Sequence, residues 1–177
     1  MAYDTKGDAL RAGEVRVTIH MNKKIKSLKN LSLKRRSLRK KGEKVVFTNG
    51  CFDIIHFGHI AYLRKAKSFG DVLIVGLNRD SSVRRIKGRT RPIVPERDRA
   101  EVLSELTCID YVVFFSEDTP YKVIKTLEPD ILVKGSDWPL DKIVGRDILR
   151  SYGGRVKRVK LIKGKSTSNI IKRIKQI

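Results

Sequence analysis

Short apolar runs alternate along this chain with longer segments whose apolar residues recur at helical spacing. The first run, Lys-Val-Val-Phe-Thr at residues 44–48, stops at the polar pair Asn49-Gly50. β-Branched and aromatic residues dominate most of the runs, and that composition favours buried strands. The further predicted strands are residues 71–77, 109–115, 131–133 and 155–161.

The segments between these runs predict helices. Apolar residues recur at helical spacing after Ile54 and predict a helix there. The other predicted helices are residues 96–106, residues 145–152 and the stretch after Ser168. One more helix is expected to begin at Pro120, with Thr119 as its cap. Residues 81–95 hold five basic residues, Gly88 and two prolines, and are interpreted as a mobile loop. The alternation predicts an α/β fold: a doubly wound, parallel five-stranded sheet with helices on both faces.

Composition divides the chain into three parts. Residues 1–21 lack a period and are interpreted as a disordered or extraneous tail. Residues 22–43 are strongly basic, and the spacing of Leu31 and Leu38 suits a helix with a thin apolar stripe. The basic residues of this helix are expected in solvent: Lys34, Arg35, Arg36, Arg39 and Lys40. Residues 44–177 form the main domain.

A net charge of +21 is typical of proteins that bind nucleic acid, because Lys and Arg neutralise phosphates. Aromatic residues make up 7% of the chain and do not alternate with the basic ones, so nucleic acid is not the expected partner. No run approaches the ~20 apolar residues of a membrane span, and the N-terminus lacks a signal-peptide core. We therefore expect a cytoplasmic protein without a membrane partner, with Cys51 and Cys108 reduced.

The turn after the first strand carries His56-Phe57-Gly58-His59. Side chains three residues apart share a helix face, so both imidazoles can point at one ligand. Gly58 lets that ligand approach the backbone, and the helix N-terminus attracts anions. A pair of surface histidines or half of a metal site is the alternative, but zinc needs three or four ligands and no third is near. The pattern predicts a phosphate site and no protein metal site.

Three other segments carry candidate chemistry. Ser166, Thr167 and Ser168 offer hydroxyls at a helix start, where simple capping is the alternative. Lys87 lies in the basic loop and can neutralise charge during phosphoryl or nucleotidyl transfer, unless that loop is only solvated surface. Asp137 follows the fourth strand and shares a sheet edge with Asn49, where ligands collect; a structural aspartate is the alternative.

These motifs, in order, resemble the nucleotidylyltransferases with an H-x-G-H motif, and in particular their ADP-heptose synthase branch. The matching stretches are VVFTNGCFDIIHFGH, GDVLIVGLNRDSSVRRIKG, RPIVPERDR, IDYVVFFSEDTP, PDILVKGSDW and GGRVKRVKLIKGKSTSNII. The resemblance implies transfer of AMP from ATP to D-glycero-β-D-manno-heptose 1-phosphate, with Mg²⁺ accompanying ATP. It also implies a homodimer and, without the fused kinase of some members, a stand-alone transferase.

The resemblance also implies roles for individual residues. The catalytic group is His56, His59, Lys87 and Arg99. The nucleotide-binding group is Asn49, Gly50, Cys51, Phe52, Gly58, Asp137, Ser166, Thr167 and Ser168. The acceptor-binding group is Asp53, Asp80 and Lys134, and Asp53 and Asp80 are also candidates for contact with the metal.

Two departures from the branch keep alternatives open. The branch has G-G-D-Y where this chain has Gly135-Ser136-Asp137-Trp138, and S-T-T where it has residues 166–168. Cytidylyltransferases share the tryptophan but carry an arginine that this chain lacks near residues 161–168. The alternatives are a cytidylyl- or adenylyltransferase with another acceptor, such as glycerol 3-phosphate or flavin mononucleotide, and a nucleotide- or RNA-binding module.

Overall fold

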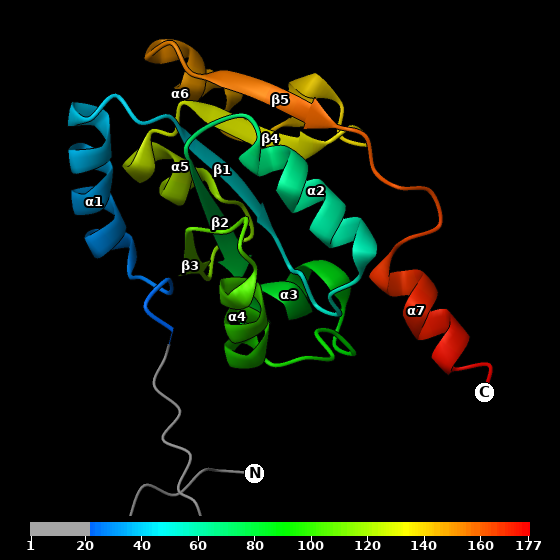
Figure 1. Ribbon diagram of the computed structural model, residues 1–177. Helices are drawn as coiled ribbons and strands as arrows, with labels where there is room; N and C mark the ends of the chain where they lie inside the picture. Colours follow the sequence, from blue (N-terminus) through cyan, green and yellow to red (C-terminus); the bar gives the residue numbers. More distant parts are fainter. Residues whose placement is uncertain (1–21) are drawn as a thin grey trace, which may run out of the picture.

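The computed structural model describes residues 22–177, so the prediction for residues 1–21 lies outside the described part. Five parallel strands form one sheet in the order β3-β2-β1-β4-β5 (Figure 1). The strands are β1 (Val45–Gly50), β2 (Val72–Asn78), β3 (Tyr111–Phe115), β4 (Ile131–Gly135) and β5 (Arg155–Val159). The helices are α1 (Leu28–Lys40), α2 (Phe57–Lys67), α3 (Asp80–Lys87), α4 (Glu96–Glu105), α5 (Tyr121–Leu127), the 3₁₀ turn η1 (Leu140–Lys142), α6 (Arg146–Ser151) and α7 (Thr167–Ile174).

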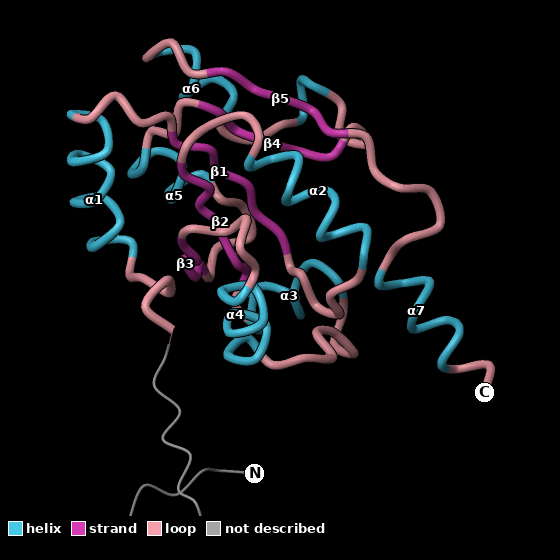
Figure 2. The backbone as a smooth tube through the Cα atoms, in the orientation of Figure 1, coloured by secondary structure: helices cyan, strands magenta, loops and turns pink. Residues whose placement is uncertain are grey.

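Helices cover both faces of the sheet (Figures 1 and 2). Alternate residues of β1 point to opposite faces. Val45 and Phe47 pack in one cluster with α1, α5 and α6, whereas Val46 packs in the other with α2 and α4. The predicted doubly wound α/β fold is confirmed. Since β2 and β4 flank β1 on opposite sides, a crevice is expected at the carboxyl ends of β1 and β4.

The basic N-terminal segment forms α1, as predicted, but one of its arginines is not in solvent. Leu31 and Leu38 are 1% and 4% exposed. Arg35 lies on the same face and is also buried. Its guanidinium pairs with Asp130 at 2.9 Å and donates to the backbone carbonyl of Glu128 at 3.0 Å. The prediction for Arg35 was wrong because its acidic partner lies far away in the sequence.

Residues 81–95 are not a loop throughout, because α3 occupies Asp80–Lys87. Ser82 and Val83 are completely buried and fix this helix against the domain. The loop begins at Gly88, whose φ of 93° suits glycine. The predicted cap of α5 was also wrong: Pro120 occupies the N-cap position, and no side chain caps that helix.

Candidate active site

A cavity of about 600 Å³ opens at the carboxyl ends of β1 and β4. It is lined by most of the residues for which the sequence predicted a role in binding or catalysis. Those residues are Asn49, Gly50, Cys51, Phe52, Asp53, His56, Gly58, His59, Lys87, Lys134, Asp137, Ser166, Thr167 and Ser168. Arg99 and Asp80 are not among the lining residues.

The two histidines stack on each other at the start of α2. His56 is the N-cap residue, and the centroids of the His56 and His59 rings lie 3.9 Å apart at an interplanar angle of 19°. The edge of Phe52 packs against His59, with 5.2 Å between ring centroids. Phe52 itself has a φ of 44°, a left-handed conformation that is costly for a residue with a side chain. The sequence predicted the shared face, and the structure adds the stacking.

Gly58 brings the start of α2 close to the segment before α7. A Cβ atom at this position would lie 3.0 Å from the His56 ring and 3.0 Å from Cβ of Lys165. Both distances are tighter than ordinary van der Waals contact. The glycine therefore serves packing between two cavity walls, besides leaving the backbone open toward the cavity.

Both imidazoles are electrically neutral near pH 7. Burial and the neighbouring His56 lower the pKa of His59 to about 4, although a hydrogen bond with the backbone of Ile54 acts in the opposite direction. Burial and the nearby Lys165 lower the pKa of His56. Both ring nitrogens of His56 and Nδ1 of His59 are buried without a hydrogen-bond partner in residues 22–177. Buried polar atoms without a partner are costly. Since a neutral imidazole carries one N–H, each ring can donate one hydrogen bond to an oxygen of a bound anion.

The start of α7 lines the cavity next to the histidine turn. Ser166 is its N-cap residue, and Oγ of Ser166 accepts a hydrogen bond from the backbone N–H of Asn169 at 3.1 Å. Oγ1 of Thr167 donates to the carbonyl of Ile54 at 3.4 Å, which ties α7 to the turn that carries the histidines. The capping alternative therefore holds for Ser166. The helix N-terminus still faces the same cavity as the histidine pair.

A buried lysine occupies the carboxyl end of β4. Nζ of Lys134 hydrogen-bonds to Oδ1 of Asn49 at the end of β1, so the two strand ends meet as predicted. Burial lowers the pKa of Lys134 to about 8, although the charge of Asp137 acts in the opposite direction. The ring of Trp138 lies 5.8 Å from Nζ. This corner of the cavity offers one ammonium beside an aromatic ring.

The loop of residues 88–95 is held by Asp53. Oδ1 of Asp53 accepts hydrogen bonds from the backbone N–H groups of Ile93 and Val94, both at 2.8 Å, and Oδ2 pairs with Arg91. Burial raises the pKa of Asp53, but these bonds outweigh burial and the net pKa is lowered. Asp53 therefore positions the loop, and its contact with the acceptor or the metal stays a prediction.

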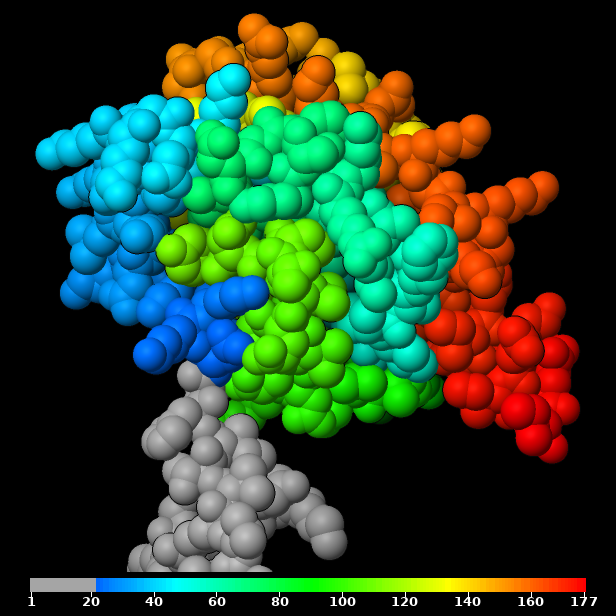
Figure 3. Space-filling view, in the orientation of Figure 1, coloured from blue at the N-terminus to red at the C-terminus, as the bar shows by residue number. Residues whose placement is uncertain are grey.

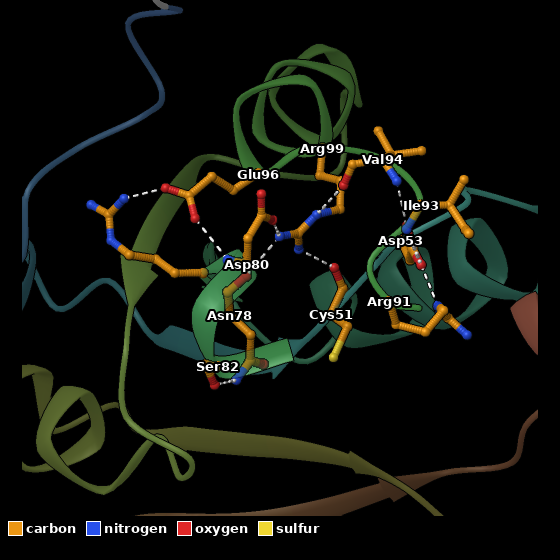
Figure 4. A network of polar contacts seen from close by, with 11 residues as sticks. Cys51, Asp53, Asn78, Asp80, Ser82, Arg91, Ile93, Val94, Glu96 and Arg99 are labelled. Carbon is orange, nitrogen blue, oxygen red and sulfur yellow. Dashed lines mark hydrogen bonds and ion pairs between the residues drawn. The ribbon is translucent and has the colours of Figure 1, made fainter. Parts of the chain in front are cut away.

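Arg99 does not line the cavity. It is 1% exposed and lies in a network at the ends of β1 and β2 (Figure 4). Its guanidinium donates to the carbonyls of Val94 at 2.9 Å and Asn78 at 3.0 Å, and to that of Cys51. It also pairs with the carboxylate of Asp80 at 2.6 Å. Arg99 therefore joins the segments that frame the cavity, and neither it nor Asp80 faces the cavity.

Arg91 and Lys165 line the cavity and were not among the predicted site residues. Arg91 lies in the basic segment, and Lys165 lies next to the predicted hydroxyls, so position alone could have suggested both. Lys87 ends α3, is exposed and forms no ion pair within residues 22–177. Its ammonium is therefore available to a ligand in the cavity.

Comparisons with known proteins agree with this geometry. The sequence model of the cytidylyltransferase-like family matches residues 47–173. The chain is 54% identical over 151 residues to the bifunctional protein HldE of Geobacter metallireducens, covering 85% of this chain and 31% of that protein. The protein of the same name from Syntrophotalea carbinolica is 57% identical over 136 residues, covering 77% of this chain and 28% of that protein. The chain thus spans about a third of the length of these relatives.

Solved structures are similar as well. The lipopolysaccharide core biosynthesis protein of Thermoplasma volcanium is 35% identical with a TM-score of 0.58, covering 70% of this chain and all of that one. Pantoate-β-alanine ligase from Francisella tularensis has a TM-score of 0.58 at 20% identity, covering 86% of this chain and 78% of that one, and shows the fold alone. The family match extends over both walls of the cavity, from the histidine turn to α7. The chain belongs to the cytidylyltransferase-like family.

Proposed function

We propose that this chain is an adenylyltransferase that moves AMP from ATP to D-glycero-β-D-manno-heptose 1-phosphate. An oxygen of the sugar phosphate attacks the α-phosphorus of ATP, and the bond from that phosphorus to the β-phosphate oxygen breaks. The products are ADP-heptose and pyrophosphate. The observation that carries the proposal is the neutral His56–His59 pair, which lines one cavity together with the residues that open α7.

Two further findings support this choice of substrates. The motifs of the ADP-heptose synthase branch surround the cavity, and the relatives that match the chain at 54% and 57% identity are named HldE. The homodimer and the cytoplasmic location that we expect from the sequence stay predictions.

The protein contributes positioning and charge, because the proposed step needs no covalent intermediate. His56 and His59 donate N–H groups to oxygens of the α- and β-phosphates, and these bonds strengthen as charge builds on the leaving pyrophosphate. The backbone N–H groups at the start of α7 hold the β- and γ-phosphates. Lys87 neutralises the triphosphate from the other side. Lys134 is placed to hold the phosphate of the acceptor.

Mg²⁺ is expected to bind in this cavity together with the nucleotide. Within residues 22–177 no three His, Cys, Asp or Glu side chains gather closely enough to hold a metal ion. Of the carboxylates in the cavity wall, Asp137 forms no ion pair within residues 22–177, whereas Asp118 pairs with Arg85 at 2.7 Å. When bound with ATP, Mg²⁺ would be held chiefly by phosphate oxygens and water and would neutralise phosphate charge.

One observation favours a second candidate. Trp138, the residue shared with cytidylyltransferases, lies in the cavity wall and is 49% exposed, so its identity bears directly on the ligand. A CTP-dependent transfer to another phosphate acceptor is therefore the alternative.

Pyrophosphate release separates the two candidates. Each of ATP, CTP, GTP and UTP is supplied with Mg²⁺, alone, with heptose 1-phosphate, or with glycerol 3-phosphate. Release with ATP that depends on the heptose phosphate is the expected result. Release with CTP and glycerol 3-phosphate, or no acceptor-dependent release, would refute the proposed substrates.

Replacing a histidine tests the catalytic pair. His59→Ala should lower kcat by ~100-fold or more, which corresponds to a few kcal/mol of lost transition-state stabilisation. The matched control is Arg64→Ala on the exposed side of the same helix, which should leave kcat unchanged. An unaltered kcat for His59→Ala would remove this residue from the mechanism.

Lys87 can be tested against a neighbour of equal charge. Lys87→Ala should lower kcat/KM by ~100-fold, because a cation at the phosphates is lost. Arg84 lies on the same helix, is exposed and does not line the cavity, so Arg84→Ala should behave like the unmodified protein. Equal kinetics for the two variants would assign Lys87 to the surface.

A further inference from the structure

The C-terminal part of the chain carries positive charge without any negative charge. Residues 148–177 contain ten Lys and Arg residues and no Asp or Glu. All ten are exposed. None of them forms an ion pair with another residue in the described range 22–177. Lys165 lines the cavity, and the charge of the other nine residues is left for a partner or for solvent ions.

This charge lies along one side of the molecule. Among the described strands, β5 is an edge strand of the sheet and pairs with β4 alone. From β5 the chain runs directly to α7, and Figure 3 shows these residues (orange to red) following one margin of the domain. We call residues 155–177 the basic margin.

α7 adds an apolar arc to the basic margin. Three isoleucines of α7 fall at spacings of one and four residues and so share one side of the helix, and a fourth follows three residues after the helix ends. They are Ile170, Ile171, Ile174 and Ile177. Arg173 and Lys175 flank this arc at helical spacing. No residue of α7 is buried, and Ile174 is 59% exposed.

We propose that the basic margin and α7 bind the surface of a bilayer containing anionic phospholipids. Basic residues beside an unpartnered apolar arc match anionic head groups above acyl chains. Because α7 spans eight residues, its apolar area is small and binding needs the charges as well. The helix would lie in the interface. Within residues 22–177 no helix is long and apolar enough to span a membrane. This inference revises the expectation of no membrane partner.

Other occupants fit the basic margin less well. Surfaces for single-stranded nucleic acid offer aromatic rings for stacking, but Tyr152 is the one aromatic residue of 148–177 and lies ahead of the basic margin. A second copy of the chain docking on α7 would bring two basic margins together without acidic residues between them, and like charges oppose such contact. An anionic lipid surface satisfies both the charge and the apolar arc.

The test measures vesicle binding, so its result does not depend on the proposed enzymatic activity. The full chain is sedimented with vesicles of equal parts phosphatidylcholine and phosphatidylglycerol, and with vesicles of phosphatidylcholine alone. Binding to the anionic vesicles, reduced by salt, and no binding to the neutral ones are expected. Arg173→Gln with Lys175→Gln should weaken binding by about tenfold or more, as should Ile174→Ser with Ile177→Ser.

The control variant has the same net charge as the variant Arg173→Gln with Lys175→Gln. Arg36→Gln with Lys40→Gln removes two charges from the exposed face of α1 and should leave vesicle binding within about twofold of the unmodified protein. The proposal is overturned if anionic vesicles are not bound, or if the control loses binding equally. Binding that survives Ile174→Ser with Ile177→Ser also overturns it. RNA binding would then test for a general polyanion surface, and sedimentation equilibrium for a second copy.

Discussion

Arg99 offers the sharpest test of how the cavity is built. The sequence resemblance implies a phosphate contact, whereas the structure places the guanidinium in a buried network. Arg99→Met removes every donor while keeping a side chain of similar length. The variant therefore separates a structural role from a direct role in substrate binding.

The magnitude follows from the groups that lose their partner. Arg99 serves three backbone carbonyls and the carboxylate of Asp80, whose side chain is 21% exposed. Breaking a buried ion pair by removing one partner costs about 3–5 kcal/mol. We expect that loss in the free energy of unfolding. For a domain of this size it corresponds to a decrease in Tm of about 10 °C or more.

Urea unfolding followed by circular dichroism measures this loss directly. Arg97→Met is the matched control, because Arg97 lies on the same helix and is exposed. The control should unfold within about 0.5 kcal/mol of the unmodified protein. If the Arg99→Met protein has unchanged stability but releases no pyrophosphate, the structural role is refuted and a direct contact of Arg99 with the substrate phosphates is supported.

Three further predictions concern other parts of the molecule. Because the pKa of Lys134 is about 8, its charge is present below that pH and is lost as pH rises through it. At pH values above about 8, the KM for the acceptor should therefore increase. Lys134→Met should raise that KM at pH 7 and remove its dependence on pH, which initial rates measure. A KM independent of pH in the unmodified protein would contradict the role of Lys134. Asp53→Asn should free residues 88–95, which limited proteolysis detects as faster cleavage there; unchanged cleavage would show that the carboxylate does not hold this loop. Arg35→Met and Asp130→Asn should each destabilise the protein by about 2–4 kcal/mol, with a coupling energy of about 1–3 kcal/mol in a double-mutant cycle. Additive effects would contradict a specific pair.

The sheet could be predicted because its strands are buried on both faces and therefore read as continuous apolar runs. β2 is the clearest case, since every residue from Val72 to Asn78 is buried. The cavity residues could be located for a related reason. They follow strand ends or open helices, where the topology of a parallel sheet brings ligand-binding groups together.

The arginines that pair with other segments of the protein could not be distinguished from surface charge by composition. Arg91 and Arg99 are held by partners that distant segments supply, and no local pattern reveals such partners. Arg35 had a usable signal: it lies four residues after Leu31 and three before Leu38, and so shares their buried face. α3 gave little helical signal, because its buried side chains are limited to Ser82 and Val83.

The two walls of the cavity have a consequence for how the protein is made. The histidine turn is translated before the residues that open α7, which lie about a hundred positions later in the sequence. Domains begin to fold while synthesis proceeds, and β1, β2 and β3 can pair before β4 and β5 emerge. During that interval the buried nitrogens of the histidines face an incomplete cavity. Nucleotide binding therefore requires nearly the whole domain to have left the ribosome.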